Sequence, residues 1–293
     1  MKRKCIPMNI DFIKMEGAGN DYVYLDLVKN NYDVDYSDLA LKIADRHFGV
    51  GGDGLVLMMN SESADYRMCM FNADGSEAEM CGNAVRCVGK YLFDRAYLEH
   101  EEFSIETLGG IKHLRIMEKD SKGKASQLRV DMGEPILNGR QIPVSFDMEP
   151  VKSVEVRGYE GTAVSMGNPH FVIVVEEITD NHVLIDGPLI EVAPQFPKKT
   201  NVEFVRVIDR ENIEMRVWER GSGETLACGT GACASAVACV LNDLTSRKIN
   251  VHLLGGTLQI EWDQATGTVY MTGPATEVFK GVYRYQNTER IAQ

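Results

Sequence analysis

The sequence predicts an α+β protein of two pseudo-symmetric lobes, each a curled, mainly antiparallel sheet around a central helix. Three observations predict it: many short strand-like runs, two nearly charge-free helical stretches that each follow a Cys-Gly pair, and an internal repeat of low identity. A helix that is apolar on every face must be enclosed by protein. With so many short strands available, the economical packing is a sheet curled about each helix.

The strands are expected where β-branched, aromatic and aliphatic residues run between Gly, Asn, Asp and Pro. These runs are Tyr22–Leu25, Gly54–Met59, Tyr66–Phe71, Phe171–Val175, Asn201–Val207, Glu214–Trp218, Leu258–Trp262 and Val269–Met271. A first helix is expected to begin near Ser37 as its N-cap, because Leu39, Ile43 and Ala44 follow at helical spacing.

Two further helices are predicted directly after Cys81 and Cys228. Residues 232–241 contain no charged side chain, and the stretch after Cys81 carries only Arg86 and Lys90 before Asp94. Both are therefore expected to be the central helices of the two lobes.

The internal repeat joins residues 67–82 with residues 214–229. Each copy is a strand, a polar Gly-Ser turn, a short acidic loop, a Cys-Gly pair and a buried helix, which indicates an old duplication. We expect an N-terminal lobe of residues 1–125 plus 274–293 carrying Cys81 and a C-terminal lobe of residues 126–273 carrying Cys228. The polar stretch Glu118–Ser126 is expected to pass between the lobes, with the active site in the cleft between them.

Composition limits the kind of protein. Its 293 residues suffice for two domains, and 44% hydrophobic and 25% charged residues are ordinary for a globular chain. The net charge of −12 argues against a nucleic-acid or anionic-membrane surface. Neither an export signal nor a membrane span is recognisable. Seven cysteines without a small-scaffold pattern favour free thiols in a reducing, cytoplasmic location.

A cysteine at a helix N-terminus faces unpaired N–H groups and the positive end of the helix dipole. Both favour the thiolate, so the pKa of Cys81 and of Cys228 is predicted to fall. A lone helical cysteine is more often a small buried hydrophobe, but a second copy in matching context indicates two acid/base groups on opposite faces of one carbon, which inverts a stereocentre. The buried-hydrophobe role is assigned to Cys69, Cys87, Cys233 and Cys239, and Cys5 is given no role.

At these cysteines the sequence resembles a known family. Residues 71–87 (FNADGSEAEMCGNAVRC) and 218–232 (WERGSGETLACGTGA) resemble the two cysteine signatures of diaminopimelate epimerases, and the match continues at residues 14–22, 167–170, 201–204 and 273–279. The resemblance implies the two-lobe fold and a cofactor-independent, two-thiol epimerase that interconverts LL- and meso-2,6-diaminopimelate by proton abstraction and re-addition at Cα. Such an isomerase serves lysine and peptidoglycan-precursor synthesis and needs no metal.

The same resemblance implies the binding residues. Those around the reacting carbon are Asn20, Gly82, Asn83, Glu219, Gly229 and Thr230, and those that hold the distant amino-acid end are Asn72, Asn168, Asn201 and Arg220. His170 is implied as a supporting residue near the thiols. The chemistry suits these roles, because a guanidinium fork fits a carboxylate and amides both donate and accept. The plainer interpretations are a turn at Asn168–His170, loop amides, and a solvated Arg220.

One departure and several alternatives stand beside this interpretation. Part of the family carries Gln where this chain has Gly54. Residues 49–54 match G-x-G-x-x-G, but a helix is expected before them and a strand after, so we interpret them as a turn. A zinc site on Cys81, Cys228 and His170 lacks the usual ligand spacing, and disulfide formation between the two cysteines is interpreted as a hazard. Another amino-acid racemase or a non-catalytic amino-acid-binding protein of the same fold stay open, as does a homodimer.

Overall fold

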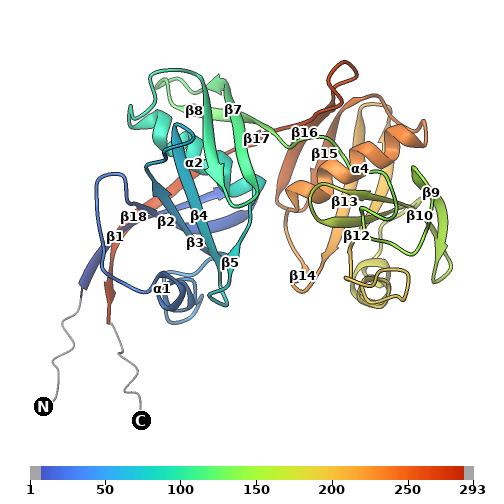
Figure 1. Ribbon diagram of the computed structural model, residues 1–293, viewed down its shortest axis with the longest axis horizontal. Coiled ribbons are helices and arrows are strands. Elements are labelled where there is room, and N and C mark those ends of the chain that lie inside the picture. The colour runs from blue at the N-terminus through green and yellow to red at the C-terminus, as the bar shows by residue number, and fades with distance from the viewer. Residues whose placement is uncertain (1–7, 287–293) are drawn as a thin grey trace, which may run out of the picture. The chain divides into compact units, whose positions relative to one another are not determined.

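The computed structural model describes residues 8–286 of the chain. The chain divides into two compact units (Figure 1). Unit 1 consists of Met1–Gly17, Asp21–His113 and Ala275–Gln293, and unit 2 of Ala18–Asn20 and Leu114–Pro274. The long segment of unit 2 begins at Leu114, before the predicted lobe boundary at residues 125/126. It ends at Pro274, next to the predicted boundary at residues 273/274.

Unit 1 is built on a sheet in which neighbouring strands are mostly antiparallel. Its strands are β1 (Met8–Gly17), β2 (Asn20–Asp26), β3 (Gly54–Met59), β4 (Tyr66–Asn72), β5 (Glu77–Ala78), β6 (Glu102–Thr107) and β18 (Thr276–Tyr285). β18 returns from the far end of the chain to pair antiparallel with β1. Two pairs in this unit, β2–β3 and β4–β6, are parallel.

Unit 2 contains the longer series of strands. They are β7 (Gly110–Lys119, from Leu114 onward), β8 (Ala125–Asp131), β9 (Val151–Val156), β10 (Tyr159–Ser165), β11 (Pro169–Val174), β12 (Asn201–Asp209), β13 (Asn212–Glu219), β14 (Gly223–Glu224), β15 (Lys248–Leu253), β16 (Gly256–Trp262) and β17 (Val269–Pro274). Every strand that the sequence predicted coincides with one of these or with a strand of unit 1.

The strand pairings repeat between the units. In unit 1, β2 pairs parallel with β3, β3 antiparallel with β4, β4 antiparallel with β5, and β4 parallel with β6. In unit 2, β11, β12, β13, β14 and β15 pair with the same directions in the same order. The internal repeat seen in the sequence is therefore confirmed at the level of topology.

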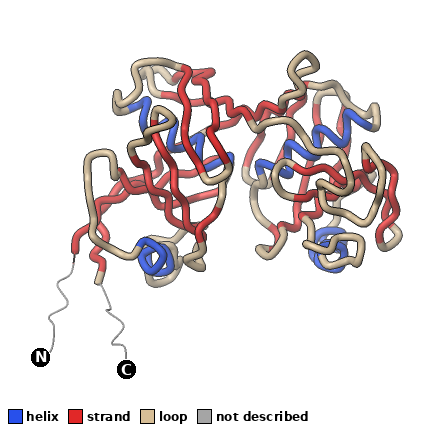
Figure 2. The backbone as a smooth tube through the Cα atoms, viewed as in Figure 1, coloured by secondary structure: helices blue, strands red, loops and turns tan. Residues whose placement is uncertain are grey.

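Each repeat encloses one long helix, α2 (Gly82–Asp94) or α4 (Gly229–Leu241). Figure 2 shows both in blue among the red strands of their own unit. All residues of α4 from Gly231 to Cys239 are buried, as its uncharged sequence predicted. In α2 the buried charge is Arg86, which donates to Asn83 Oδ1 at 2.9 Å and to the Gly82 carbonyl at 3.3 Å. These bonds offset part of the cost of burying a guanidinium.

The shorter helices cover the outer faces of the sheets. α1 (Tyr36–Ile43) buries Leu39, Ala40 and Ile43 against the core of unit 1. The expected N-cap Ser37 is wrong: Asp35 caps α1, because its extended backbone lets the carboxylate accept from the N–H groups of Ser37 and Asp38. In unit 2, the π-helix η1 (Asn181–Asp186) and α3 (Gly187–Glu191) follow β11.

The predicted inter-lobe passage Glu118–Ser126 is also wrong. It forms the end of β7, a tight turn and the start of β8, which pair antiparallel. Asp120 closes the turn by accepting from the N–H groups of Lys122 and Lys124, and Gly123 takes a positive φ of 75°. Polar and Gly-rich residues suit a hairpin turn as well as a linker, so composition alone did not separate the two.

None of the helices within residues 8–286 combines the length and the hydrophobicity that a membrane span requires.

Candidate active site

Cys81 and Cys228 occupy the same position in the two repeats. Each is the N-cap of its long helix, with extended backbone angles. Cys81 Sγ accepts from the Ala84 N–H at 3.5 Å, and Cys228 Sγ accepts from the Gly231 N–H at 3.3 Å. Both sulfurs thus face the N–H groups that a helix leaves unpaired at its first turn, as the sequence predicted.

The predicted fall in the pKa of Cys228 is wrong. Burial raises the pKa of Cys228 well above its usual value, the carboxylates of Glu219 and Glu203 raise it further, and the bonds from Thr230 and Gly231 only partly oppose this. A helix terminus contributes up to about 2 kcal/mol, whereas full burial shifts a pKa by up to about 3–5 units, several kcal/mol. Burial and the carboxylates therefore outweigh the helix dipole at this thiol.

A chain of hydrogen bonds connects Cys228 to the interior of unit 2. The Thr230 hydroxyl lies 3.5 Å from Cys228 Sγ, and Asn168 Nδ2 donates to that hydroxyl at 3.3 Å. Asn168 Oδ1 lies 3.0 Å from His170 Nε2, and His170 Nδ1 lies 2.6 Å from Glu203 Oε1. The structure thus brings together the predicted residues Cys228, Thr230, Asn168 and His170, and adds Glu203.

The end of β13 brings a second carboxylate to the same thiol. Burial raises the pKa of Glu219, whereas hydrogen bonds with Thr225 and Cys228 and the nearby His170 act in the opposite direction. The carboxylates of Glu203 and Glu219 therefore both act on the Cys228 thiol.

The turn after Glu219 is held from within unit 2. Asn201 Oδ1 accepts from the Arg220 N–H at 2.9 Å, while its Nδ2 donates to the Pro169 carbonyl at 2.8 Å. The Arg220 side chain is exposed and donates to the Lys198 carbonyl at 3.3 Å. Asn201 therefore positions Arg220, a role that its sequence context did not indicate.

Glu191 was missed by sequence reasoning. Its carboxylate accepts from the Gly221 N–H at 3.1 Å and from Trp218 Nε1 at 2.8 Å. These two hydrogen bonds hold the segment that carries Glu219 and Arg220 in place. Glu203 was also missed, although a signal existed: it is a single acidic residue between apolar neighbours in a buried strand, Val202 and Phe204.

Two of the predicted residues form the start of α2 in unit 1. Gly82 and Asn83 form its first turn and are buried, and the Arg86 guanidinium donates to the side-chain Oδ1 of Asn83. Asn72, at the end of β4, donates from Nδ2 to Ser76 Oγ at 3.0 Å. Asn20 begins β2 but groups with unit 2, where the preceding Gly19 packs within reach of Gly255 and Leu226.

Gly54 has a steric reason. A Cβ at this position would lie 2.0 Å from the Phe71 carbonyl oxygen and 3.0 Å from the Tyr22 ring. The first contact, with a backbone atom, is shorter than any a real Cβ makes, and the second would require the Tyr22 ring to shift. The absence of Gln at this position therefore follows from the close pairing of β3 and β4.

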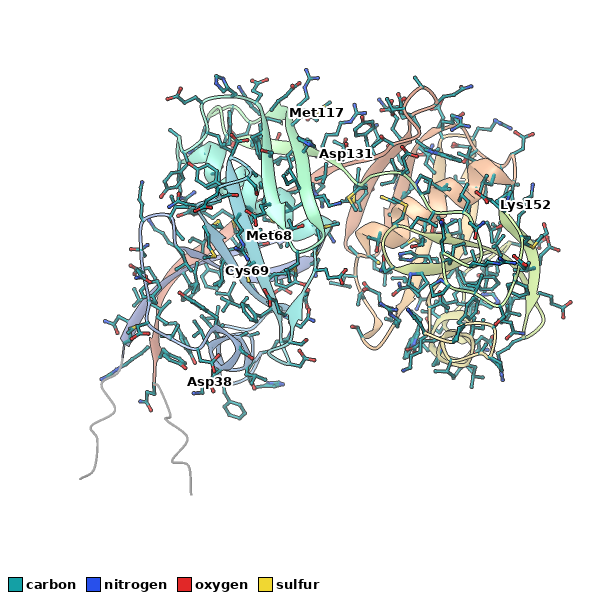
Figure 3. All side chains as sticks on the ribbon, in the orientation of Figure 1. Asp38, Met68, Cys69, Met117, Asp131 and Lys152 are labelled. Carbon is teal, nitrogen blue, oxygen red and sulfur yellow. The ribbon has the colours of Figure 1, made fainter. Side chains whose placement is uncertain are left out.

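The other cysteines lie away from the helix starts. Cys87, Cys233 and Cys239 are buried, as predicted. Cys69 on β4 (Figure 3) is only partly buried, because its thiol donates to Glu77 Oε1 at 3.1 Å at the sheet surface. Burial raises the pKa of Cys69 to about 12, so its thiol stays protonated at neutral pH. Cys5 lies outside the described residues.

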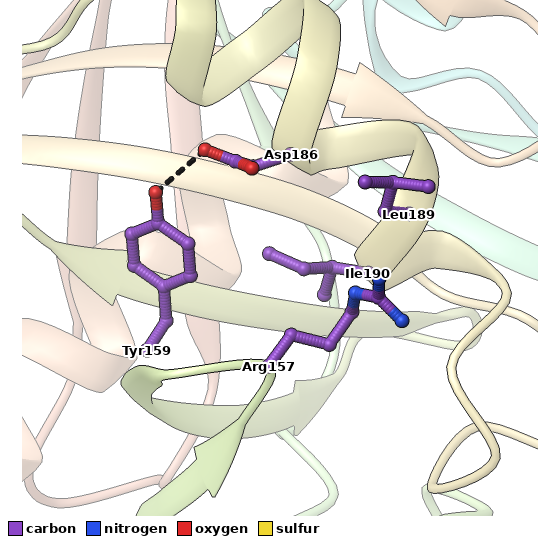
Figure 4. A pocket seen from close by; sticks show the side chains of 5 residues that line it. All are labelled: Arg157, Tyr159, Asp186, Leu189 and Ile190. Carbon is purple, nitrogen blue, oxygen red and sulfur yellow. Dashed lines mark hydrogen bonds between the residues drawn. The ribbon is translucent and has the colours of Figure 1, made fainter.

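Two further features belong to the described part of the chain. Within residues 8–286, no group of three or more His, Cys, Asp or Glu side chains is arranged to hold a metal ion. A cavity of about 320 Å³ in unit 2 is lined by Arg157, Tyr159, Asp186, Leu189 and Ile190 (Figure 4). The Tyr159 hydroxyl donates across it to Asp186 Oδ2 at 2.7 Å. None of the predicted site residues lines this cavity.

Comparison of the backbone with solved structures shows which known folds it is similar to. It is similar to a phenazine biosynthesis protein of the PhzF family from Bacillus anthracis, with a TM-score of 0.67 and 17% identity over 94% of this chain and 99% of that one. It is also similar to a hydroxyproline epimerase from Agrobacterium vitis, with a TM-score of 0.65 and 13% identity over 98% and 95% of the two chains. At these identities the likeness shows the fold alone, and it agrees with the predicted two-lobe α+β class.

Sequence comparison narrows the relationship. The profile of the family described as diaminopimelate epimerase matches residues 12–138 and 162–278. The chain is 54% identical to the diaminopimelate epimerase of Acetivibrio thermocellus over 92% of its own length and 97% of the relative. It is 52% identical to that of Desulfovibrio desulfuricans over 93% and 97% of the two chains. With matching cysteines at both helix starts and a match through most of its length, this chain belongs to the diaminopimelate epimerase family.

Proposed function

We propose that this chain is a cofactor-independent epimerase that interconverts LL- and meso-2,6-diaminopimelate, with Cys81 and Cys228 as its acid/base pair. One observation carries the proposal. In a chain about half identical to named diaminopimelate epimerases, two thiols cap buried helices at equivalent positions of a duplicated fold.

The chemistry follows from two thiols acting on one carbon. A thiolate removes the Cα proton from one face, and a thiol delivers a proton to the other face. One C–H bond breaks and one forms, and the sulfurs exchange roles, so the number of protons is unchanged. Charge that develops on the substrate carboxylate during this step is stabilised by the unpaired N–H groups at the helix starts, including those of Gly82 and Gly229.

The remaining side chains distinguish the two ends of the substrate in this proposal. Asn20, Asn83, Glu219 and Thr230 hold the reacting end, where Glu219 accepts from the substrate ammonium. Arg220 binds the distant carboxylate through its guanidinium fork, and Asn72, Asn168 and Asn201 lie at the same distant amino-acid end, where amides can donate to a carboxylate and accept from an ammonium. The exposed Arg220 side chain, anchored at its backbone by Asn201, supports this assignment.

Two properties of the working enzyme belong to the same proposal. The enzyme acts in a reducing, cytoplasmic environment, because oxidation of the two thiols to a disulfide would remove both catalytic groups. It also assembles as a homodimer, which light scattering coupled to size-exclusion chromatography tests directly.

Incubation of reduced protein with LL-diaminopimelate in D2O tests the function. We expect deuterium at Cα together with formation of the meso isomer. Cys81→Ser and Cys228→Ser should each lower epimerisation by roughly 10²–10⁴-fold, since general acid/base groups contribute this much. Cys69→Ser is the matched control and should retain activity. If a folded, reduced chain exchanges no Cα proton of diaminopimelate, the proposal is wrong.

A further inference from the structure

Glu203 is a buried acidic residue, and a contribution to protein stability does not explain why it is there. Its side chain and that of His170 are both 0% exposed, and its second oxygen, Oε2, has no hydrogen-bond partner within residues 8–286. Replacing a buried ion pair by apolar residues is often neutral or stabilising, and an unpaired carboxylate oxygen costs more still. Buried, incompletely paired acids of this kind are typical of functional sites.

The hydrogen bonds around His170 determine where its protons lie. Asn168 donates from Nδ2 to Thr230, which leaves Oδ1 facing His170 Nε2. Because an amide oxygen only accepts, Nε2 must carry a proton. A second proton is shared between His170 Nδ1 and Glu203 Oε1 across 2.6 Å. Glu203 thus fixes the ring in the one arrangement that completes the chain of bonds to Thr230 and Cys228.

Glu203 also lies against the first turn of α4. A Cβ added to Gly231 would be 2.8 Å from Glu203 Oε1 and 3.2 Å from Cys228 Sγ, so the carboxylate, the glycine and the sulfur are in close succession. The charged groups that act on Cys228 are Glu203 on β12 and Glu219 on β13. His170 on β11 is paired with Glu203 and lowers the pKa of Glu219. A carboxylate at this position opposes the positive end of the helix dipole.

We propose that Glu203 is a positioning residue which, held by His170 beneath the first turn of α4, keeps Cys228 in its thiol form. Ionisation of Cys228 would place a further negative charge beside the carboxylates of Glu203 and Glu219, and the positive charge of His170 offsets only one of these, so burial makes the thiolate unfavourable. The raised pKa of Cys228, with Glu203 among its causes, agrees with this arrangement. The inference rests on the proposed function for its meaning, because it makes Cys228 the proton donor of the pair in the resting enzyme.

Alkylation of Cys228 tests the inference without turnover. In a Cys81→Ser background, the rate of iodoacetamide modification at Cys228 is followed against pH by peptide mass spectrometry, with and without Glu203→Gln. Glutamine keeps the size and an acceptor for His170 but removes the charge. We expect the midpoint to fall by about 0.7 pH unit, which is a roughly five-fold faster reaction at a fixed pH below it. Glu214→Gln, a half-exposed acid on β13 paired with Arg206, is the matched control and should leave the midpoint in place.

A folded Glu203→Gln chain with an unmoved midpoint would overturn the inference, since a merely structural role alters stability but not this titration. If the variant does not fold, ¹⁵N NMR of the histidines in the unsubstituted protein tests the inference instead. His170 should carry a proton on Nε2 and show a far-downfield Nδ1 proton. An unprotonated Nε2 would contradict the inference. An epimerase with an unmoved midpoint fails only this inference, whereas a moved midpoint without Cα exchange fails only the proposed function.

Discussion

Replacing Gly231 by alanine should damage the reaction far more than the fold. The added methyl would lie 2.8 Å from Glu203 Oε1 and 3.2 Å from Cys228 Sγ. Neither neighbour is free to retreat, because Glu203 is bound to His170 and the Cys228 backbone caps α4. The glycine does not have the positive φ that would itself disfavour alanine.

Two opposing terms determine the stability of this variant. Alanine gains about 1 kcal/mol over glycine inside a helix, and overpacking a filled core costs about 1–3 kcal/mol. The net loss is about 0–2 kcal/mol, so Tm should fall by less than about 5 °C, at roughly 2 °C per kcal/mol for a chain of this size. Displacing a catalytic group by about 1 Å can cost about 100-fold in rate, which corresponds to about 2.7 kcal/mol of barrier.

Thermal unfolding and epimerisation measured on the same preparation check this. Ala238→Gly reverses the substitution in the same helix, where Ala238 is fully buried. It loses about 1 kcal/mol of helix propensity and about 0.8 kcal/mol of methyl burial, so its Tm should fall by about 4 °C with activity retained. If Gly231→Ala keeps kcat/KM within three-fold of the unsubstituted enzyme, the steric reasoning about this turn is refuted.

Three other outcomes are expected. Burial raises the pKa of Cys87 and of Cys239 to about 12 from the usual 9. As the pH rises, these thiols therefore ionise in the unfolded chain before they ionise in the folded one. Their contribution to the free energy of unfolding is fully present below pH 9, and each thiol lowers that free energy by about 1 kcal/mol between pH 9 and 10. Urea unfolding should show this slope, and Cys239→Ala should reduce it. Leu39→Ala, in the fully buried face of α1, should destabilise by about 2–5 kcal/mol in the same assay; a loss below 1 kcal/mol would contradict the core packing described for unit 1. Chelators should leave epimerisation unchanged and thiol alkylation should abolish it; loss on metal removal would restore the zinc interpretation.

Most of the secondary structure was predictable because local patterns determine it. Strands such as β3 and β13 follow from apolar runs between turn residues, and the uncharged sequence of α4 sufficed to predict its enclosure. The duplication, visible as two similar Cys-Gly contexts, predicted two similar lobes, and the repeated strand pairings agree with it. The errors arose where one composition serves two structures: the polar stretch 118–126 is a hairpin turn rather than a linker, and Asp35 rather than Ser37 caps α1.

The sequence by itself determined the fold class, the position of both thiols at helix starts, and the family, because these depend on local order and on long signatures. Only the tertiary structure decided the chemical state of Cys228. Glu203, His170 and Glu219 come from three different strands, and only the sheet brings them to the thiol. Desolvation and the charges of these distant residues exceed the local effect of the helix terminus. The pKa of a buried group is a property of its surroundings in space, which sequence neighbours do not specify.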